Sequence, residues 1–374
     1  MGNVIIFLIF PLFILFRLYV IFFVPLTPYV AEPILFSDLL GKPIFLSPYF
    51  KIGIGLINLM FIMLISKRLV TSKIWYIPAF LYTISPWNVY LETGGSLYIL
   101  VLTFLMLMFV GFKFVKNNRL SFSLVLIAAS GMLYTSLLMW FALPLLIFGL
   151  FKLNFFDASK FKAYILGLFI ICLPLIFASI TNFQGLRNIF SNQVSVFSEV
   201  GLVNAVNTFR GEIAQTNFSI FGKLTENRYF YLSEHLVFNL LKHLTPVTYF
   251  TPEFKMFDFS FSPPLLLGFL LPFMFGLKNI FDFSLKNKWV FLVILSLILP
   301  SILSKNSPDL NRLVLITPVM FVLIAEGFKT LITKKSVVYK LLLALTLIIV
   351  FSQLLTVISD IFLRENMRLF QIKK

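Results

Sequence analysis

The sequence predicts an all-α polytopic membrane protein with about 11 transmembrane helices. Hydrophobic residues make up 59% of the 374 residues, charged residues make up 12%, and the mean hydropathy is +0.97. Soluble domains contain about 45–50% apolar and about 25% charged residues, so this composition excludes a water-soluble globular fold. The apolar runs are long and do not alternate with polar residues, which favours membrane helices over a membrane β-barrel.

Eleven apolar runs, delimited by charged or turn residues, are the predicted membrane spans. They cover residues 4–25, 46–66, 74–88, 95–112, 120–136, 138–151, 162–181, 264–278, 289–304, 312–331 and 337–359. The fifth and sixth runs are short and meet at Tyr134–Trp140, so ten spans also fit the pattern. We expect N-terminal transmembrane helices over 1–182 with a short external loop at 26–45, an extracytoplasmic segment at 183–262, and C-terminal transmembrane helices over 263–374.

The net charge of +16 follows from membrane topology. With the N-terminus in the cytoplasm, the cytoplasmic loops hold 16 basic residues against two acidic ones, Asp157 and Asp282. The segment 183–262 holds six basic and six acidic residues, so the loops follow the positive-inside rule. The charge is therefore mostly a signal of topology and does not indicate nucleic acid. Membrane lipid is an expected partner of such a protein. Within the long segment, Val194–Val206 and Leu232–Leu244 are amphipathic, and we expect helices that lie along the external membrane face.

Polar residues in or beside apolar runs mark candidate functional positions, because the bilayer excludes such groups. Arg17 lies inside the first run, where it can extend to the external surface or pair with another helix. Glu32 and Asp38 follow in the first external loop. Each of these carboxylates could act as a general base or bind a divalent cation, and simple solvation is the alternative.

Three further candidates come from the segment 85–95 between the third and fourth runs, where we expect a tight external turn. Trp87 and Tyr90 either line a site or anchor the chain at the membrane interface. Glu92 is unusual, since an external turn does not need a carboxylate so close to the apolar boundary.

Arg210 and Arg312 are the candidate anion-binding residues on the external side. Arg210 lies in the long external segment, where a phosphate and a neighbouring acidic side chain are both possible partners. Arg312 enters an apolar run from the external side, which suits a lipid phosphate and equally an ordinary interfacial anchor.

At these positions the chain resembles the GT-C superfamily of membrane glycosyltransferases, in particular bacterial relatives of the protein O-mannosyltransferases and of the lipid A aminoarabinose transferase. Arg17 and the stretch that ends at Glu32 are similar to the family's first-span arginine and its Asp-Glu motif. Ser85–Trp87 is similar to the family's Ser-Pro-Trp block. The later blocks Val200–Arg210 and Leu310–Gly327 resemble its large external segment and a late span.

The resemblance implies an inverting transfer of a sugar from a polyprenyl-phosphate donor to a glycan, lipid or protein acceptor. The reaction would take place on the extracytoplasmic face of a bacterial plasma membrane. Glu32 or Asp38 would act as the base, and a divalent cation is permitted but not required. The implied phosphate-binding cations are Arg210, Arg312 and Lys51, and the implied site-lining residues are Trp87, Tyr90 and Glu92.

Several positions depart from the family pattern. Ala31 stands where the family has the aspartate that is its expected base, and the first external loop is shorter than the family's. Asn88, Glu92-Thr93 and Thr251–Glu253 replace other expected site residues. A catalytically inactive GT-C-like scaffold or accessory subunit is therefore an alternative. A lipid or solute transporter is a further one, although no paired Gly- or Pro-broken spans occur in corresponding halves.

Overall fold

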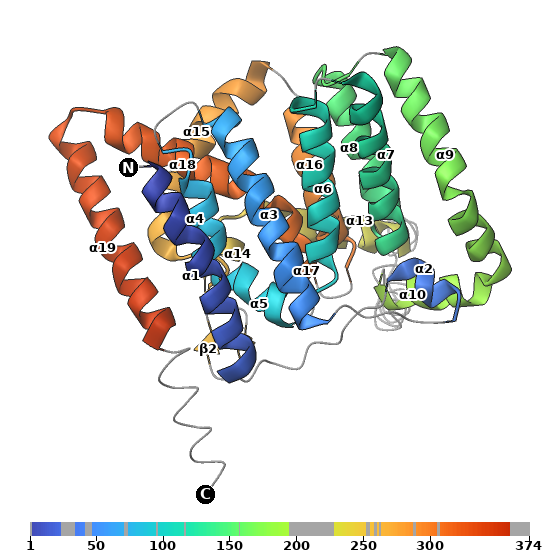
Figure 1. Cartoon of the computed structure of the whole chain (residues 1–374), viewed down its shortest axis with the longest axis horizontal. Coiled ribbons are helices and arrows are strands. Elements are labelled where there is room, and N and C mark those ends of the chain that lie inside the picture. Colours follow the sequence, from blue (N-terminus) through green and yellow to red (C-terminus); the bar gives the residue numbers. More distant parts are fainter. Residues whose placement is uncertain are drawn as a thin grey trace, which may run out of the picture.

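The computed structural model describes most of the chain as helices packed side by side (Figure 1). The described residues are 2–23, 34–41, 47–70, 74–94, 96–115, 117–156, 158–193, 228–251, 255–257, 260–261, 263–286, 289–304 and 307–359. The termini of this part belong to α1 (Gly2–Phe23) and α19 (Val337–Ser359).

The other helices of the N-terminal half are α2 (Leu35–Leu39), α3 (Pro48–Leu69), α4 (Ile77–Ile84), α5 (Pro86–Gly94), α6 (Tyr98–Lys113), α7 (Asn118–Thr135), α8 (Met139–Lys152), α9 (Ala158–Thr181) and α10 (Phe183–Gln193). The C-terminal half contains α13 (Arg228–Leu244), α14 (Val247–Phe250), η2 (Leu267–Phe269), α15 (Leu270–Lys286), α16 (Trp289–Ile302), α17 (Leu310–Leu313), η3 (Val314–Ile316) and α18 (Thr317–Thr333). The strands β1 (Lys255–Phe257) and β2 (Ser260–Phe261) form a short antiparallel pair in which Lys255 lies opposite Phe261.

The helical class is confirmed, but 11 spans are not. Among the described residues, four helical stretches are long and apolar enough to cross a membrane: Tyr49–Leu69, Lys160–Thr181, Leu310–Thr333 and Val337–Ser359. The pair α5 and α6, bent by 114°, would make a fifth. Four further apolar helical stretches are shorter, at 10–17 residues: Leu8–Val20, Met139–Lys152, Leu267–Asn279 and Trp289–Ile302. The structure thus describes four or five membrane-length helices.

The expected single span at 74–88 is wrong, because this run forms two short helices, α4 and α5, that break at Ser85. Pro86 disfavours helical geometry at the preceding residue, and Ser85 is extended, with ψ 121°. The eight residues of α4 extend over about 12 Å, whereas the hydrocarbon core is about 30 Å thick. The expected turn at 85–95 is instead mostly the helix α5, which carries Trp87, Tyr90 and Glu92 into the interior.

The fifth and sixth runs form two separate helices. α7 ends at Thr135 and α8 begins at Met139. Ser136 between them is extended, with φ −140° and ψ 131°. This break favours two elements over a single continuous span.

Two glycines bring α15 and α18 into close contact. A Cβ at Gly276 would overlap the carbonyl oxygen of Leu323, and a Cβ at Gly327 would overlap that of Pro272. Small residues allow this approach of two backbones, which is common between membrane helices. α18 is mostly buried, whereas α9 and α19 lie at the two outer edges of the bundle in Figure 1 and expose many apolar side chains.

Candidate functional site

A buried ion pair joins α1 to α5. Arg17 Nε donates to Glu92 Oε2 at 2.6 Å, and neither side chain is exposed. The guanidinium also donates to the carbonyl oxygens of Tyr82 and Thr83, and it lies 3.9 Å from the centre of the Phe13 ring. Arg17 therefore pairs inside the bundle, which is the second of the two alternatives that its position allowed.

Glu92 is enclosed on its other side by α3 and α4. The Tyr82 hydroxyl donates to Glu92 Oε1. A Cβ at Gly55 would lie 2.7 Å from the Glu92 carboxyl carbon, so only glycine leaves room for this side chain. Because a buried carboxylate needs a counter-ion and hydrogen bonds, Glu92 acts as the internal partner of Arg17 and ties α1, α4 and α5 together.

A second buried polar group, the Arg312 cluster, consists of Arg312, Asp309, Ser304, Ser301 and His243. Arg312 Nη1 lies 2.9 Å from Asp309 Oδ2, and it also donates to Ser304 Oγ. The Ser304 hydroxyl donates to Asp309 Oδ2 at 3.1 Å. The other carboxylate oxygen of Asp309 accepts the backbone N–H of Asn311 and so caps the start of α17. The loop before α17 thus holds the guanidinium in place.

The cluster continues through Ser301 to His243 on α13. The Asp309 N–H donates to Ser301 Oγ at 2.8 Å, and Ser301 Oγ lies 2.7 Å from His243 Nε2. His243 Nδ1 lies 2.6 Å from the Asn239 carbonyl oxygen, which can only accept, so Nδ1 carries the hydrogen and Nε2 accepts from Ser301 in the neutral ring. Burial lowers the pKa of His243, while the Asp309 carboxylate acts in the opposite direction. The ring is therefore neutral at pH 7.

Trp87 connects α5 to the Arg312 cluster. Its indole N–H donates to the Leu310 carbonyl oxygen at 2.9 Å, and its ring lies 6.3 Å from that of Tyr249. Trp87 and Tyr90 are both buried, so neither is an interfacial anchor. α5 consequently joins the helix that carries Arg312 to the buried pair of Glu92 and Arg17.

Of the remaining predicted site residues, the structure describes Lys51 and Asp38, which lie on two other helices. Lys51 is buried in the first turn of α3. Asp38 is partly buried on α2, which packs against α7, α9 and α10 and lies away from α3 and α5 in Figure 1. Glu32 and Arg210 lie outside the described residues, and so does the expected helix at Val194–Val206. Within the described part of the chain, no three His, Cys, Asp or Glu side chains come together as a metal site would require.

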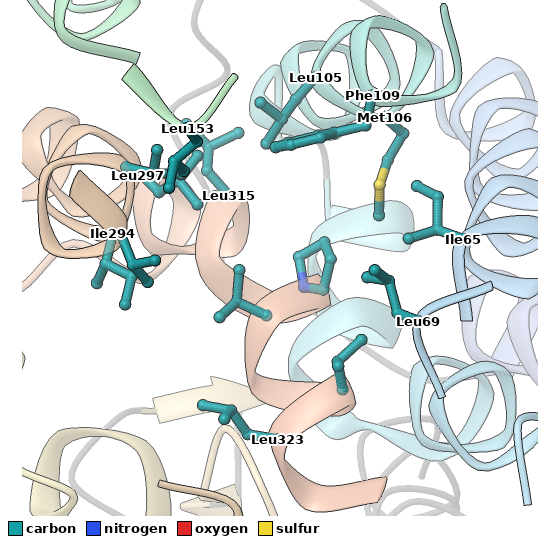
Figure 2. Close-up of a pocket in the computed structure, with 15 residues that line it drawn as sticks. Ile65, Leu69, Leu105, Met106, Phe109, Leu153, Ile294, Leu297, Leu315 and Leu323 are labelled. Atoms are coloured by element: carbon teal, nitrogen blue, oxygen red, sulfur yellow. The ribbon is translucent and has the colours of Figure 1, made fainter. Parts of the chain in front are cut away.

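An apolar cavity of about 230 Å³ lies between α3, α6, α16 and α18 (Figure 2). Figure 2 shows Leu297 and Leu315 on one side of the cavity and Ile65 and Leu69 on the other. Its lining residues are Ile65, Leu69, Leu105, Met106, Phe109, Leu153, Val290, Val293, Ile294, Leu297, Leu315, Pro318, Val319, Val322 and Leu323.

Two cavity-lining residues, Leu315 and Leu297, lie about one helical turn along the chain from members of the Arg312 cluster. Leu315 follows Arg312 by three residues, and Leu297 precedes Ser301 by four, which places each pair on one side of its helix. The lining also includes Leu69, the last residue of α3. A buried cation thus lies about one helical turn from a lining residue of an apolar space, and such a combination suits an anionic head group with an apolar tail.

Sequence reasoning did not find Tyr82, Ser301 or Ser304. Ser301 and Ser304 follow Pro300 at the end of an apolar run, and Asp309 and Arg312 follow them closely. This concentration of polar residues at the end of an apolar helix is a signal that could have indicated the cluster. Tyr82 is surrounded by apolar residues in the sequence and carried no such signal.

The described residues thus form a helical protein in which four or five helices are long and apolar enough to span a membrane. Two buried polar clusters lie among these helices. No protein family model, curated protein or solved structure matches the chain.

Proposed function

We propose that the protein is an integral membrane glycosyltransferase that transfers a sugar from a polyprenyl-phosphate donor to a glycan, lipid or protein acceptor. The single observation that carries this proposal is the buried guanidinium of Arg312, three residues before Leu315 in the lining of the apolar cavity. The order of the sequence blocks that resemble GT-C enzymes supports it as well. In this proposal the membrane is a bacterial plasma membrane, the N-terminus is cytoplasmic, and the reaction takes place on the extracytoplasmic face.

The donor phosphate binds to Arg312 in this proposal, and the isoprenoid tail occupies the cavity. A guanidinium can donate two parallel hydrogen bonds to a phosphate. Arg312 already donates to an anionic partner, Asp309, so the phosphate takes the place of that carboxylate. Lys51, buried in the first turn of α3, and Arg210 are the additional proposed cations.

The reaction is a displacement at the anomeric carbon. The acceptor hydroxyl oxygen forms a bond to this carbon while its bond to the phosphate oxygen breaks, and the configuration inverts. Glu32 or Asp38 takes the hydroxyl proton, and polyprenyl phosphate leaves with the electron pair, its charge stabilised by the cations. Trp87 joins α5 to the segment that carries Arg312, Glu92 holds that helix through Arg17, and Tyr90 lines the site in this proposal.

A catalytically inactive relative is the second candidate function. Ala31 occupies the position of the base expected from the family, and Arg312 is held by an internal carboxylate. Such a protein would bind the lipid phosphate as a scaffold or accessory subunit and would not release a sugar.

The test uses the purified full-length chain in lipid nanodiscs with polyprenyl-phosphate-linked hexoses and pentoses. Sugar transfer by the wild type supports the enzyme, whereas donor binding without turnover supports the inactive relative. Absence of both overturns the proposal. Loss of turnover in Glu32→Gln or Asp38→Asn identifies the base.

Arg312→Gln provides the test of the phosphate site. We expect it to weaken polyprenyl-phosphate binding by about 10- to 100-fold, because hydrogen bonds to charged groups contribute about 1.5–3 kcal/mol each. Arg119→Gln is the matched control, since Arg119 is exposed in the first turn of α7. Equal binding of polyprenyl phosphate by the two variants would show that Arg312 does not bind the phosphate.

A further inference from the structure

The helix α13 exposes a row of large apolar side chains, although its inner side already packs Leu236 and Leu240 against the core. Asn239 and His243 face inward and are only 1–2% exposed. The outward side chains are large and apolar: Val237, Phe238, Leu241 and Leu244 are 54–59% exposed. A helix on a protein in water normally places its apolar stripe against the core. The orientation of α13 therefore indicates an apolar environment outside it.

Specific polar contacts fix this orientation. Asn239 Nδ2 donates to the Ile302 carbonyl oxygen at the end of α16, at 3.4 Å. One turn later, His243 contacts Ser301 on the same helix at 2.7 Å. Rotation of α13 to bury its apolar row would break both contacts and leave buried polar groups without partners. The apolar row is thus exposed because of how the helix docks.

The charged residues of α13 fit the boundary of a bilayer. Lys242 is exposed beside Leu241, and its ammonium nitrogen lies 5.1 Å from the centre of the Phe238 ring. A lysine whose stem follows an apolar surface can keep its ammonium group at the level of the lipid phosphates. Glu234 is exposed near the other end of the helix. α13 is not among the helices long and apolar enough to cross a membrane.

We propose that α13 is an interfacial helix seated in the membrane leaflet at the end of α16. Phospholipid acyl chains contact Val237, Phe238, Leu241 and Leu244, and Lys242 lies at the head groups. Val247 on α14, 53% exposed, extends this apolar surface beyond the end of the helix. The inference concerns the partner of one surface and is independent of glycosyl transfer.

Site-directed spin labelling of the full chain tests this inference. The chain has one cysteine, so Cys172→Ala provides the background for Phe238→Cys and Leu241→Cys. His235→Cys, exposed and seven residues before Lys242 on the same side of the helix, is the matched control. Each labelled protein is placed in nanodiscs of phosphatidylcholine and phosphatidylglycerol, and relaxation by molecular oxygen and by a water-soluble nickel chelate is compared.

We expect labels at 238 and 241 to collide with oxygen several-fold more than with the nickel chelate, and the label at 235 to show the reverse. Equal access of the nickel chelate to all three labels would place α13 in water and overturn the proposal. Protection of 238 and 241 from both reagents would mean that protein covers the helix, which also overturns it. If the cysteine variants do not fold, quenching by brominated lipids is measured above the background of the four native tryptophans and compared between Phe238→Trp and His235→Trp, which gives the same decision.

Discussion

Arg17 on α1 and Glu92 on α5 form an ion pair of 2.6 Å in which neither side chain contacts solvent. The two residues are 75 positions apart in the chain. Tyr82 donates a further hydrogen bond to the carboxylate, and the Tyr82 and Thr83 carbonyl oxygens accept from the guanidinium. The pair is thus fully hydrogen-bonded and holds α1, α4 and α5 in one arrangement.

Removal of one partner of this pair should strongly destabilise the protein. Glu92→Leu leaves the Arg17 guanidinium buried without its counter-ion, so we expect a loss of about 3–5 kcal/mol in the free energy of unfolding. The double variant Arg17→Met/Glu92→Leu should lose less than the sum of the two single variants. Detergent-induced unfolding followed by circular dichroism measures these changes.

The control for the ion pair is Glu326→Gln. Glu326 lies 3.0 Å from Lys329, and both side chains are partly exposed. We expect its removal to change the free energy of unfolding by about 1 kcal/mol or less. A similar effect of Glu326→Gln and Glu92→Leu would contradict the structural role of the buried pair.

His243 should make stability depend on pH. Burial lowers its pKa below the ordinary value of 6.5, so the unfolded chain binds a proton that the folded protein does not. Its contribution is fully present above pH 6.5 and is lost progressively as the pH falls below that value. Unfolding midpoints between pH 8 and pH 5 should therefore fall more steeply for the wild type than for His243→Gln.

The second histidine provides the control for this pH profile. His235 is exposed on the same helix, and His235→Gln controls for the replacement of a histidine outside the Arg312 cluster. If His243→Gln and the wild type have parallel profiles, His243 is not a neutral buried ring in the folded protein.

Gly327→Ala should separate α15 from α18. The added methyl group would overlap the Pro272 carbonyl oxygen, which is backbone and cannot rotate away. We expect a loss of about 1–3 kcal/mol in the free energy of unfolding. Gly53→Ala is the control, because no atom lies within 4 Å of its Cβ position and alanine favours a helix by about 0.5–1 kcal/mol. A stabilising effect of Gly327→Ala would refute the close contact of the two backbones.

Filling the apolar cavity should impair binding of the long lipid tail. Val319→Phe places a larger side chain into the cavity, and we expect weaker binding of long-chain polyprenyl phosphate and a smaller effect on a short-chain isoprenyl phosphate. Val338→Phe, at an exposed position on α19, makes the same change outside the cavity. Binding is measured by competition in nanodiscs, after thermal unfolding has shown that both variants fold. Unchanged long-chain binding by Val319→Phe would exclude the cavity as the tail site.

The sequence alone determined the helical class and where most of the long helices lie. Every predicted apolar run lies on one or more described helices, because a long apolar segment must satisfy its backbone hydrogen bonds within itself, and this is a local property. The sequence also distinguished Arg17, Glu92 and Arg312 as unusual, because a polar group next to apolar residues is visible without knowledge of its partner.

Only the tertiary structure decided what these residues contact. Arg17 pairs with Glu92, and Trp87 donates to the Leu310 carbonyl oxygen. His243 contacts Ser301, and in all three cases the partner lies on an element distant in the sequence. The break of the third run at Ser85 brought α5 inward, and the docking of α13 turned its apolar side outward. These outcomes depend on how whole helices pack, since the free energy of a buried polar group is set by partners that local sequence does not specify.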